Sequence, residues 1–284
     1  MASSRLARMF RALILGLVQG LTEFIPVSSS GHLVLVPFVL GWAGASRTFE
    51  LGVPFDVAVH LGTALAVVVY FRQELGRILV GALRWATGQG DRQDRAMGWL
   101  AVLLAIGSAP AAAVGILFED FFEDLFDRPQ LVALLLVGTA VLLLTGELIH
   151  RRQGEERRDF ENVDARDAVT IGIFQALAIA PGISRSGATI VGGLGRRLSR
   201  DAAARFSFLL GLPAIAGAGI VQLPDFPSGT EWGPVVAATA VSAVVGFAAI
   251  AFLLRYLRTR DLRPFAWYCV LAAAVALGFW LWLR

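Results

Sequence analysis

A carboxylate, three hydroxyls and an imidazole stand close together near the start of the chain. Gln19 and Glu23 are four residues apart, so their side chains share one face of a helix. Pro26 then ends that helix, and the segment 28–32, SSSGH, follows at once. A carboxylate can orient groups or bind a metal, a hydroxyl can attack as a nucleophile, and an imidazole can move protons. This spacing indicates a chemical site; the alternative is that Glu23 and His32 only pair and cap the broken helix.

A second segment repeats the first. The stretch 175–187, QALAIAPGISRSG, aligns without a gap on 19–31, QGLTEFIPVSSSG. The matched turn positions are Ser28 with Ser184, Ser29 with Arg185, and Ser30 with Ser186. Polar turns within apolar sequence need partners other than lipid, and two such breaks in corresponding halves point to a binding site between inverted repeats. We therefore expect the functional centre where the two turns meet.

The second turn carries a guanidinium but no carboxylate and no histidine. Arg185 offers a planar fork of donors that suits phosphate oxygens, and Gly187 lets backbone amides approach an anion. We expect the first turn to hold the reacting groups and the second to cradle phosphate. The hydroxyls expected to bind the phosphate are those of Ser28, Ser30, Ser184, Ser186 and Thr189. A plain salt bridge between Arg185 and Glu23 is the alternative, and both roles can coexist before substrate arrives.

The composition is that of a membrane protein. Hydrophobic residues make up 56% of the chain, charged residues only 17%, and the mean hydropathy is +0.67. Soluble domains contain about 25% charged residues. All 25 basic residues are arginine, and no stacked aromatic and basic motif accompanies them, so the net charge of +3 suits anionic lipid better than nucleic acid.

Six segments are long and apolar enough to span a membrane, namely 55–71, 97–118, 130–149, 206–223, 234–254 and 264–283. The stretches 9–45 and 166–200 are interrupted by the serine turns, and we interpret each as a re-entrant helix pair. The sequence thus predicts an all-α integral membrane protein with an inverted-topology repeat, six transmembrane helices and two re-entrant helix pairs. The first repeat covers 1–150 and the second 151–284. Three spans in each half invert the second half and bring the turns together.

Loop charges predict the orientation. The loop 119–128 carries five acidic side chains and one arginine, whereas the loops 72–95, 196–205 and 255–263 carry five, four and four arginines. Basic loops stay cytoplasmic, so the acidic loop and both termini are expected outside, with the site open to the periplasmic side. The arginines among the first eleven residues favour the opposite orientation, but three loops agree against them.

The turns and two further segments resemble a known family. The chain is similar, over essentially its whole length, to the bacterial undecaprenyl-diphosphate phosphatases, also known as bacitracin-resistance proteins. The matching motifs are QGLTEFIPVSSSGH at 19–32, FDVAVHLGT at 55–63, PGISRSGAT at 181–189 and FSFLL at 206–210. The two turn motifs together make this resemblance highly specific.

The resemblance implies an inner-membrane hydrolase that removes the terminal phosphate from undecaprenyl diphosphate. This lipid carrier is recycled in cell-wall peptidoglycan synthesis, so bacitracin tolerance is implied as well. By motif position, the catalytic residues are Glu23, Ser29, His32 and Arg185. A divalent metal ion, Mg²⁺ or Ca²⁺, is also implied. Gln19 occupies the first position of the family's Glu/Gln-x-x-x-Glu pattern, so Glu23 and Gln19 are the expected ligands and this chain lacks the second carboxylate that some members have.

Asp56 and His60 form another pair, four residues apart on one face of the span 55–71. They either make a buried, mutually hydrogen-bonded pair or support the reacting groups from behind. The pattern leaves both roles open.

A transporter or flippase of phosphorylated polyprenyl lipid is the alternative function, because broken helices in inverted repeats are typical of transporters. The cluster of Glu23, Ser29 and His32 favours an enzyme, since transport would not require it. Attack by Ser29 and attack by activated water both stay open. Undecaprenyl diphosphate and membrane lipid are the expected partners, nucleic acid is not, and a homodimer stays open.

Overall fold

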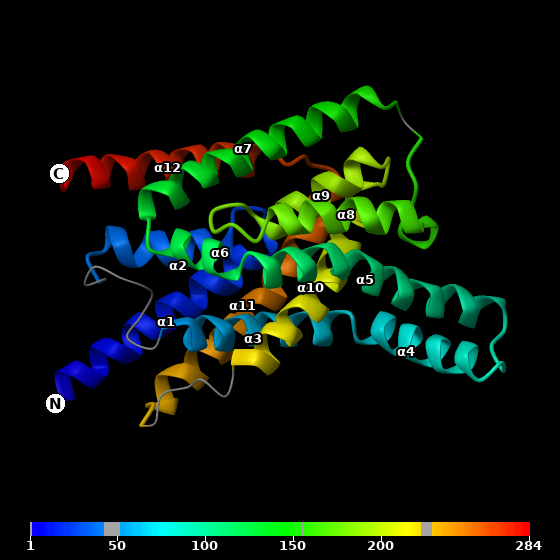
Figure 1. Ribbon diagram of the computed structural model, residues 1–284, viewed down its shortest axis with the longest axis horizontal. Helices are drawn as coiled ribbons and strands as arrows, with labels where there is room; N and C mark the ends of the chain where they lie inside the picture. Colours follow the sequence, from blue (N-terminus) through cyan, green and yellow to red (C-terminus); the bar gives the residue numbers. More distant parts are fainter. Residues whose placement is uncertain (1, 43–51, 155, 223–228) are drawn as a thin grey trace.

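The computed structural model describes residues 2–42, 52–154, 156–222 and 229–284, and in these ranges it is built from helices without a β-strand (Figure 1). The α-helices are α1 (Ala2–Phe24), α2 (Ser29–Val39), α3 (Gly52–Tyr70), α4 (Arg72–Ala86), α5 (Arg92–Leu117), α6 (Glu119–Phe126), α7 (Pro129–Arg152), α8 (Ala165–Leu177), α9 (Arg185–Gly195), α10 (Arg200–Gln222), α11 (Trp232–Leu257) and α12 (Arg263–Trp282). A short 3₁₀ helix, Phe160–Asn162, precedes α8.

Four helices in the described ranges, α5, α7, α11 and α12, are long and apolar enough to cross a membrane. They correspond to four of the predicted spans. Helices α3 and α4, bent by 79° at their junction, qualify as a fifth span only when taken together. The chain is therefore a multi-pass, all-α membrane protein.

The remaining predicted span is 206–223, of which residue 223 lies outside the described residues. Residues 206–222 lie in α10 (Arg200–Gln222), which does not qualify as a span among the described residues. Its first turns carry Arg200, Asp201 and Arg205, and the apolar side chains that follow as far as Leu210 are buried, whereas Ile220 near its end is 78% exposed. Phe206 and Phe208 are fully buried, and the Phe208 ring meets that of Phe24 edge-on at 5.1 Å between centroids. Helix α10 thus forms part of the core behind the serine turns.

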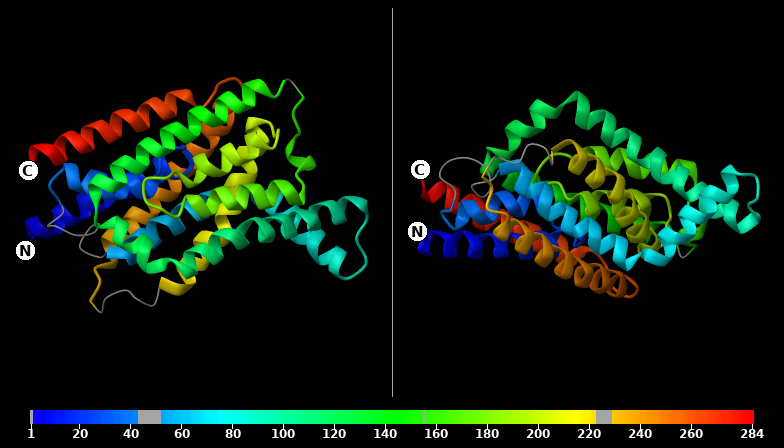
Figure 2. Two further views of the ribbon diagram at one scale, coloured as in Figure 1. Left: turned by 45° about the horizontal axis from the view of Figure 1, so that its top comes forward. Right: turned by 90° about the horizontal axis from the view of Figure 1, so that it is seen from below.

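Two segments predicted as loops are largely helical. The arginine-rich stretch 72–95 contains α4 and the start of α5, which form a hairpin that projects from one end of the molecule (Figure 1, Figure 2). Asp91 and Asp94 close the hairpin with a reciprocal capping box. The acidic stretch 119–128 contains α6. Both helices have a charged face and an apolar face, so their average hydropathy conceals their periodicity.

Helices α1 and α8 both end just before a serine turn. Ser28 precedes α2 and its Oγ accepts a hydrogen bond from the amide of Gly31 at 3.2 Å. Ser184 caps α9 in the same way, through the amide of Gly187 at 3.1 Å. Because serine is a strong N-cap, the repeated Ser-x-Ser-Gly pattern starts a new helix at the same place in both copies.

Each broken helix packs mainly against a helix from the other half of the chain. Helix α1 lies along α11, and α8 lies along α5. Helices α7 and α12 run side by side along one edge of the bundle (Figure 1, Figure 2). In lipid, helices associate through close packing and hydrogen bonds rather than through the hydrophobic effect. This crossing of the halves brings the two turns together.

Candidate active site

The carboxylate of Glu23 joins the two turns. Its Oε1 accepts a hydrogen bond from Arg185 NH2 at 2.7 Å. Its Oε2 accepts from Ser29 Oγ at 2.6 Å and from Gln19 Nε2 at 2.9 Å. Only 5% of Glu23 is exposed, so these bonds compensate for the loss of water around a charged group. The groups predicted to react and the guanidinium predicted to bind phosphate therefore meet at one carboxylate.

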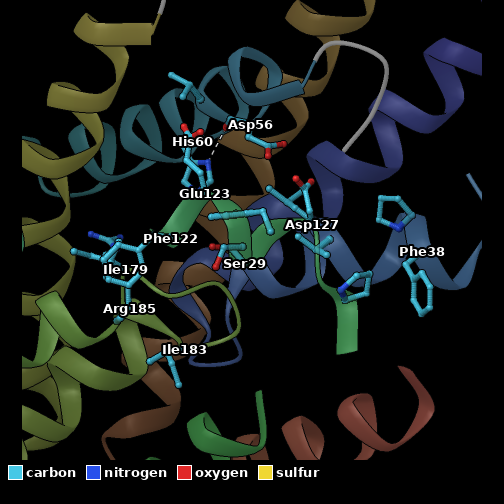
Figure 3. A pocket seen from close by; sticks show the side chains of 18 of the residues that line it. Ser29, Phe38, Asp56, His60, Phe122, Glu123, Asp127, Ile179, Ile183 and Arg185 are labelled. Carbon is cyan, nitrogen blue, oxygen red and sulfur yellow. Dashed lines mark hydrogen bonds between the residues drawn. The ribbon is translucent and has the colours of Figure 1, made fainter. Parts of the chain in front are cut away.

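His60 is the imidazole nearest to Glu23 among the described contacts. Its Nε2 lies 3.5 Å from Glu23 Oε2. Its Nδ1 lies 2.7 Å from the backbone oxygen of Asp56, and it must donate there because a carbonyl only accepts (Figure 3). Nδ1 thus bonds to the Asp56 backbone rather than to the carboxylate that one of the two open roles would require, and Nε2 is turned toward Glu23.

His32, the predicted proton relay, is not brought to Glu23 or Ser29. Its Nδ1 lies 2.8 Å from the backbone oxygen of Ser28, and its Nε2 lies 2.8 Å from the hydroxyl of Tyr268 on α12. The ring is buried and stacks on the Tyr268 ring. Its role in proton transfer stays a prediction that this geometry does not favour.

A cavity of about 820 Å³ opens beside Glu23. Its polar end is formed by Glu23, Ser29, Ser30, Asp56, His60 and Arg185 (Figure 3). The rest of the lining comes largely from α2, α6 and the end of α12 and combines apolar side chains such as Phe38, Phe122 and Phe279 with the acidic Glu119, Glu123 and Asp127. Such a cavity suits a ligand with a charged head and an apolar tail.

The predicted phosphate-binding hydroxyls separate into two groups. Ser30 lines the cavity, next to the predicted nucleophile Ser29. The other four predicted hydroxyls are buried and hydrogen-bonded within the protein; they belong to Ser28, Ser184, Ser186 and Thr189. For example, Thr189 Oγ1 lies 2.6 Å from the hydroxyl of Ser207 on α10. The second group shapes the turns, and contact with phosphate stays a prediction for it.

Arg185 retains donor capacity that the described protein groups do not use. Its NH1 is buried and has no hydrogen-bond partner among the described residues. The guanidinium lies directly against Gly211 of α10, where a methyl group would overlap it. A buried donor without a partner is rare, and a shift of the guanidinium toward the cavity that Arg185 lines would let a phosphate oxygen satisfy it. The N-termini of α2 and α9 also begin at the two turns and favour an anion there.

Among the residues that the structure describes, the site lacks a ligand set for a resident metal ion. No three His, Cys, Asp or Glu side chains gather at one point in the part of the chain that the structure describes. Both oxygens of Glu23 already accept hydrogen bonds, one from a guanidinium that repels a cation. Gln19 Oε1 is buried without a partner, but a single amide oxygen is a weak ligand set. The arrangement therefore does not fit a pre-bound divalent ion, and the metal dependence stays a prediction.

Two residues at the site had no assigned role in the sequence patterns. Tyr268 lies in a predicted apolar span. Its hydroxyl, a polar group within apolar sequence, is the one sequence signal that could have indicated a role for it. Gly211 reads as one of many glycines that permit close helix approach. In the structure the group that approaches it is the Arg185 guanidinium.

Comparison with known proteins gives the same family over nearly the whole chain. The family model described as Bacitracin resistance protein BacA matches residues 12–275. A protein of Geobacter metallireducens named Undecaprenyl-diphosphatase is 39% identical over 274 residues, which cover 94% of this chain and 97% of that protein. Its namesake in Moorella thermoacetica is 42% identical over 272 residues, with 95% and 98% covered.

A relative in Streptomyces coelicolor, named Undecaprenyl-diphosphatase 2, is 37% identical over 271 residues, which cover 91% of this chain and 90% of that protein. Matches of this extent leave no large part of the chain outside the family. The chain therefore belongs to the Bacitracin resistance protein BacA family.

Proposed function

We propose that this protein is an integral membrane phosphatase that hydrolyses undecaprenyl diphosphate to undecaprenyl phosphate and phosphate. This reaction recycles the lipid carrier of cell-wall synthesis and confers bacitracin tolerance. The observation that carries the proposal is the junction of Ser29, Glu23 and Arg185 at the polar end of a mostly apolar cavity. The relatives named above are all undecaprenyl-diphosphatases, which does not favour a transporter or flippase.

The inverted-topology repeat is part of this proposal, with six transmembrane helices and two re-entrant pairs. Gly16 of α1 lies against the backbone of Ala238 in α11, so closely that a methyl group there would overlap it. Gly172 of α8, its counterpart in the alignment, lies in the same way against Gly107 of α5. Equivalent glycines at equivalent helix crossings support a duplicated half that packs with its partner reciprocally.

The orientation in the bacterial inner membrane is also proposed. Acidic side chains of α6, including Glu119 and Glu123, line the cavity together with the end of α12. The arginine-rich hairpin of α4 and α5 projects from the end opposite to both termini (Figure 1). Basic segments remain cytoplasmic, so the cavity opens to the periplasmic side.

Arg185 binds and polarises the diphosphate. Its free NH1 and the amides at the starts of α2 and α9 provide donors for phosphate oxygens. Donors fixed before substrate arrives stabilise the charge that develops during phosphoryl transfer, which is the main source of catalysis in this reaction class. The apolar length of the cavity holds the start of the polyprenyl tail.

Ser29 attacks the terminal phosphorus, and its proton passes to Glu23, to which Oγ already donates. The bond from phosphorus to the bridging oxygen breaks, and undecaprenyl phosphate leaves. Water then cleaves the phosphoserine to release phosphate and restore the Ser29 hydroxyl. His60, 3.5 Å from the same carboxylate oxygen, can take the proton onward from Glu23. None of these steps passes through a metal ion.

Purified full-length protein in detergent tests the proposal. We expect it to release inorganic phosphate from undecaprenyl diphosphate and to leave undecaprenyl monophosphate. A preparation from cells without the gene is the control for contaminating phosphatases. Phosphate release no greater than in that control, together with movement of the intact lipid between leaflets of vesicles containing the protein, would contradict the phosphatase and favour the flippase.

A further inference from the structure

His32 and Tyr268 form a contact that the proposed mechanism does not use. Their rings are stacked with centroids 5.5 Å apart, and His32 Nε2 lies 2.8 Å from the Tyr268 hydroxyl. His32 Nδ1 lies 2.8 Å from the carbonyl oxygen of Ser28. Because a carbonyl only accepts, Nδ1 donates to Ser28, and Nε2 of the neutral ring accepts from Tyr268. Two hydrogen bonds thus connect α12 to the backbone of the first turn.

The carbonyl at the end of this connection belongs to a strained residue. Ser28 has φ 69° and ψ 96°, a left-handed backbone conformation that residues other than glycine rarely adopt. Such strain costs of the order of 1–3 kcal/mol and persists only where surrounding contacts impose it. Its counterpart Ser184 is relaxed, with φ −72° and ψ 118°, and Ala188 stands where His32 would be. The strain and the histidine therefore occur together, in the turn that carries Ser29.

We propose that Tyr268, acting through His32, is a positioning residue for the nucleophile. The two hydrogen bonds, together with the one from the His32 backbone amide at 3.1 Å, hold the Ser28 carbonyl in its strained orientation. That orientation sets the direction in which Ser29, the next residue, extends its hydroxyl to Glu23 at 2.6 Å. This inference rests on the proposed phosphatase function. It gives His32 a mechanical role, because its two ring nitrogens are both engaged away from the cavity.

The variant Tyr268→Phe removes the hydroxyl and keeps the stacked ring. We expect kcat for phosphate release from undecaprenyl diphosphate to fall about tenfold, with KM within about twofold of wild type, because Arg185 is untouched. Tyr70→Phe is the matched control, since the Tyr70 ring packs against Phe71 and Phe247. It should leave both constants unchanged. A Tyr268→Phe enzyme with kcat within about twofold of wild type overturns the inference.

A second variant separates positioning from a general loss of stability. Glycine adopts a left-handed φ without steric cost and is tolerated at a helix N-cap. Ser28→Gly therefore removes the backbone strain for which the hydrogen bonds compensate. In that background, Tyr268→Phe should lower kcat by less than about threefold. An undiminished tenfold loss in the double variant would mean that Tyr268 acts elsewhere. An inactive wild-type protein would instead overturn the proposed function, and this inference with it.

Discussion

The two serine turns share a backbone plan but are held in different ways. In the second turn, Thr139 of α7 donates to the Gly182 carbonyl at 2.7 Å and accepts from the Ser184 amide at 2.9 Å. In the first turn, the corresponding contact comes from Cys269 of α12 and is weak, with Sγ 4.0 Å from the Pro26 carbonyl. The second turn is thus relaxed and firmly fixed, whereas the first is strained and, as we propose, is held through His32.

The chemical groups of the two turns diverge at corresponding positions. Ile179 stands where the first repeat has Glu23, and Arg185 stands where it has Ser29. The conserved parts of the motif, the serines that cap α2 and α9, do the same structural work in both copies. A duplicated turn can thus keep its capping residues for folding while its neighbouring positions specialise, one copy for reaction and the other for anion binding.

Loss of the Glu23 carboxylate should impair the reacting turn severely. Glu23→Gln keeps the size of the side chain but cannot accept the Ser29 proton, so we expect at least about a hundredfold lower kcat. The measurement is phosphate release by purified protein with wild-type thermal stability, across a series of divalent-metal concentrations. A variant with full rate and wild-type metal dependence would show that Glu23 is structural.

Arg185→Lys tests whether the second turn binds phosphate through the guanidinium. The charge remains, but the planar fork is lost, so activity should drop at least about tenfold, or about 1.4 kcal/mol of transition-state binding. The ratio kcat/KM for undecaprenyl diphosphate is the quantity to compare. Near-normal turnover would show that a point charge suffices and that the planar fork of the Arg185 guanidinium is not needed.

Gly211→Ala disturbs the same guanidinium without changing it. The added methyl would overlap Arg185, so we expect about a fivefold rise in KM as the fork is displaced. Gly217→Ala on the same helix is the matched control, because nothing lies within 4 Å of its added methyl. Equal KM values for the two variants would contradict a role for Gly211 in placing Arg185.

Gln19→Glu should have the smallest effect. It places a second carboxylate beside Glu23 on the same helix face, and activity should stay within about threefold of wild type at saturating Mg²⁺ or Ca²⁺. A lower metal concentration at half-maximal rate is expected, since two carboxylates bind a cation better than one. Complete loss of activity at every metal concentration would show that position 19 must donate to Glu23.

The repeated turn allowed the sequence to predict which distant residues meet. Aligning the two copies suggested that Glu23 and Arg185 share one site, and the structure joins them by an ion pair. Hydropathy likewise predicted α5, α7, α11 and α12, because long apolar runs have few other structural solutions. Helices α4 and α6 were missed because their charged faces lower the average that identifies a span.

The choice between the two histidines could not be predicted from spacing. His32 is close to Glu23 in sequence. However, Ser28 stands between them, and its positive φ changes the direction of the chain where α2 begins. Its ring consequently meets Tyr268, which is 236 residues away and is placed by the packing of α12. His60 reaches Glu23 because α3 packs beside α1, a tertiary contact that no local pattern encodes.

Alanine at Ser29, compared with alanine at Ser30 and at Ser186, tests most directly whether one turn reacts and the other binds. With thermal stability matched to wild type, Ser29→Ala should lower kcat for undecaprenyl diphosphate at least about a thousandfold, while the other two lose less than about tenfold. If Ser29→Ala hydrolyses the lipid within about threefold of wild type, a difference under about 1 kcal/mol, covalent catalysis by Ser29 is excluded and water activated by Glu23 is the better mechanism.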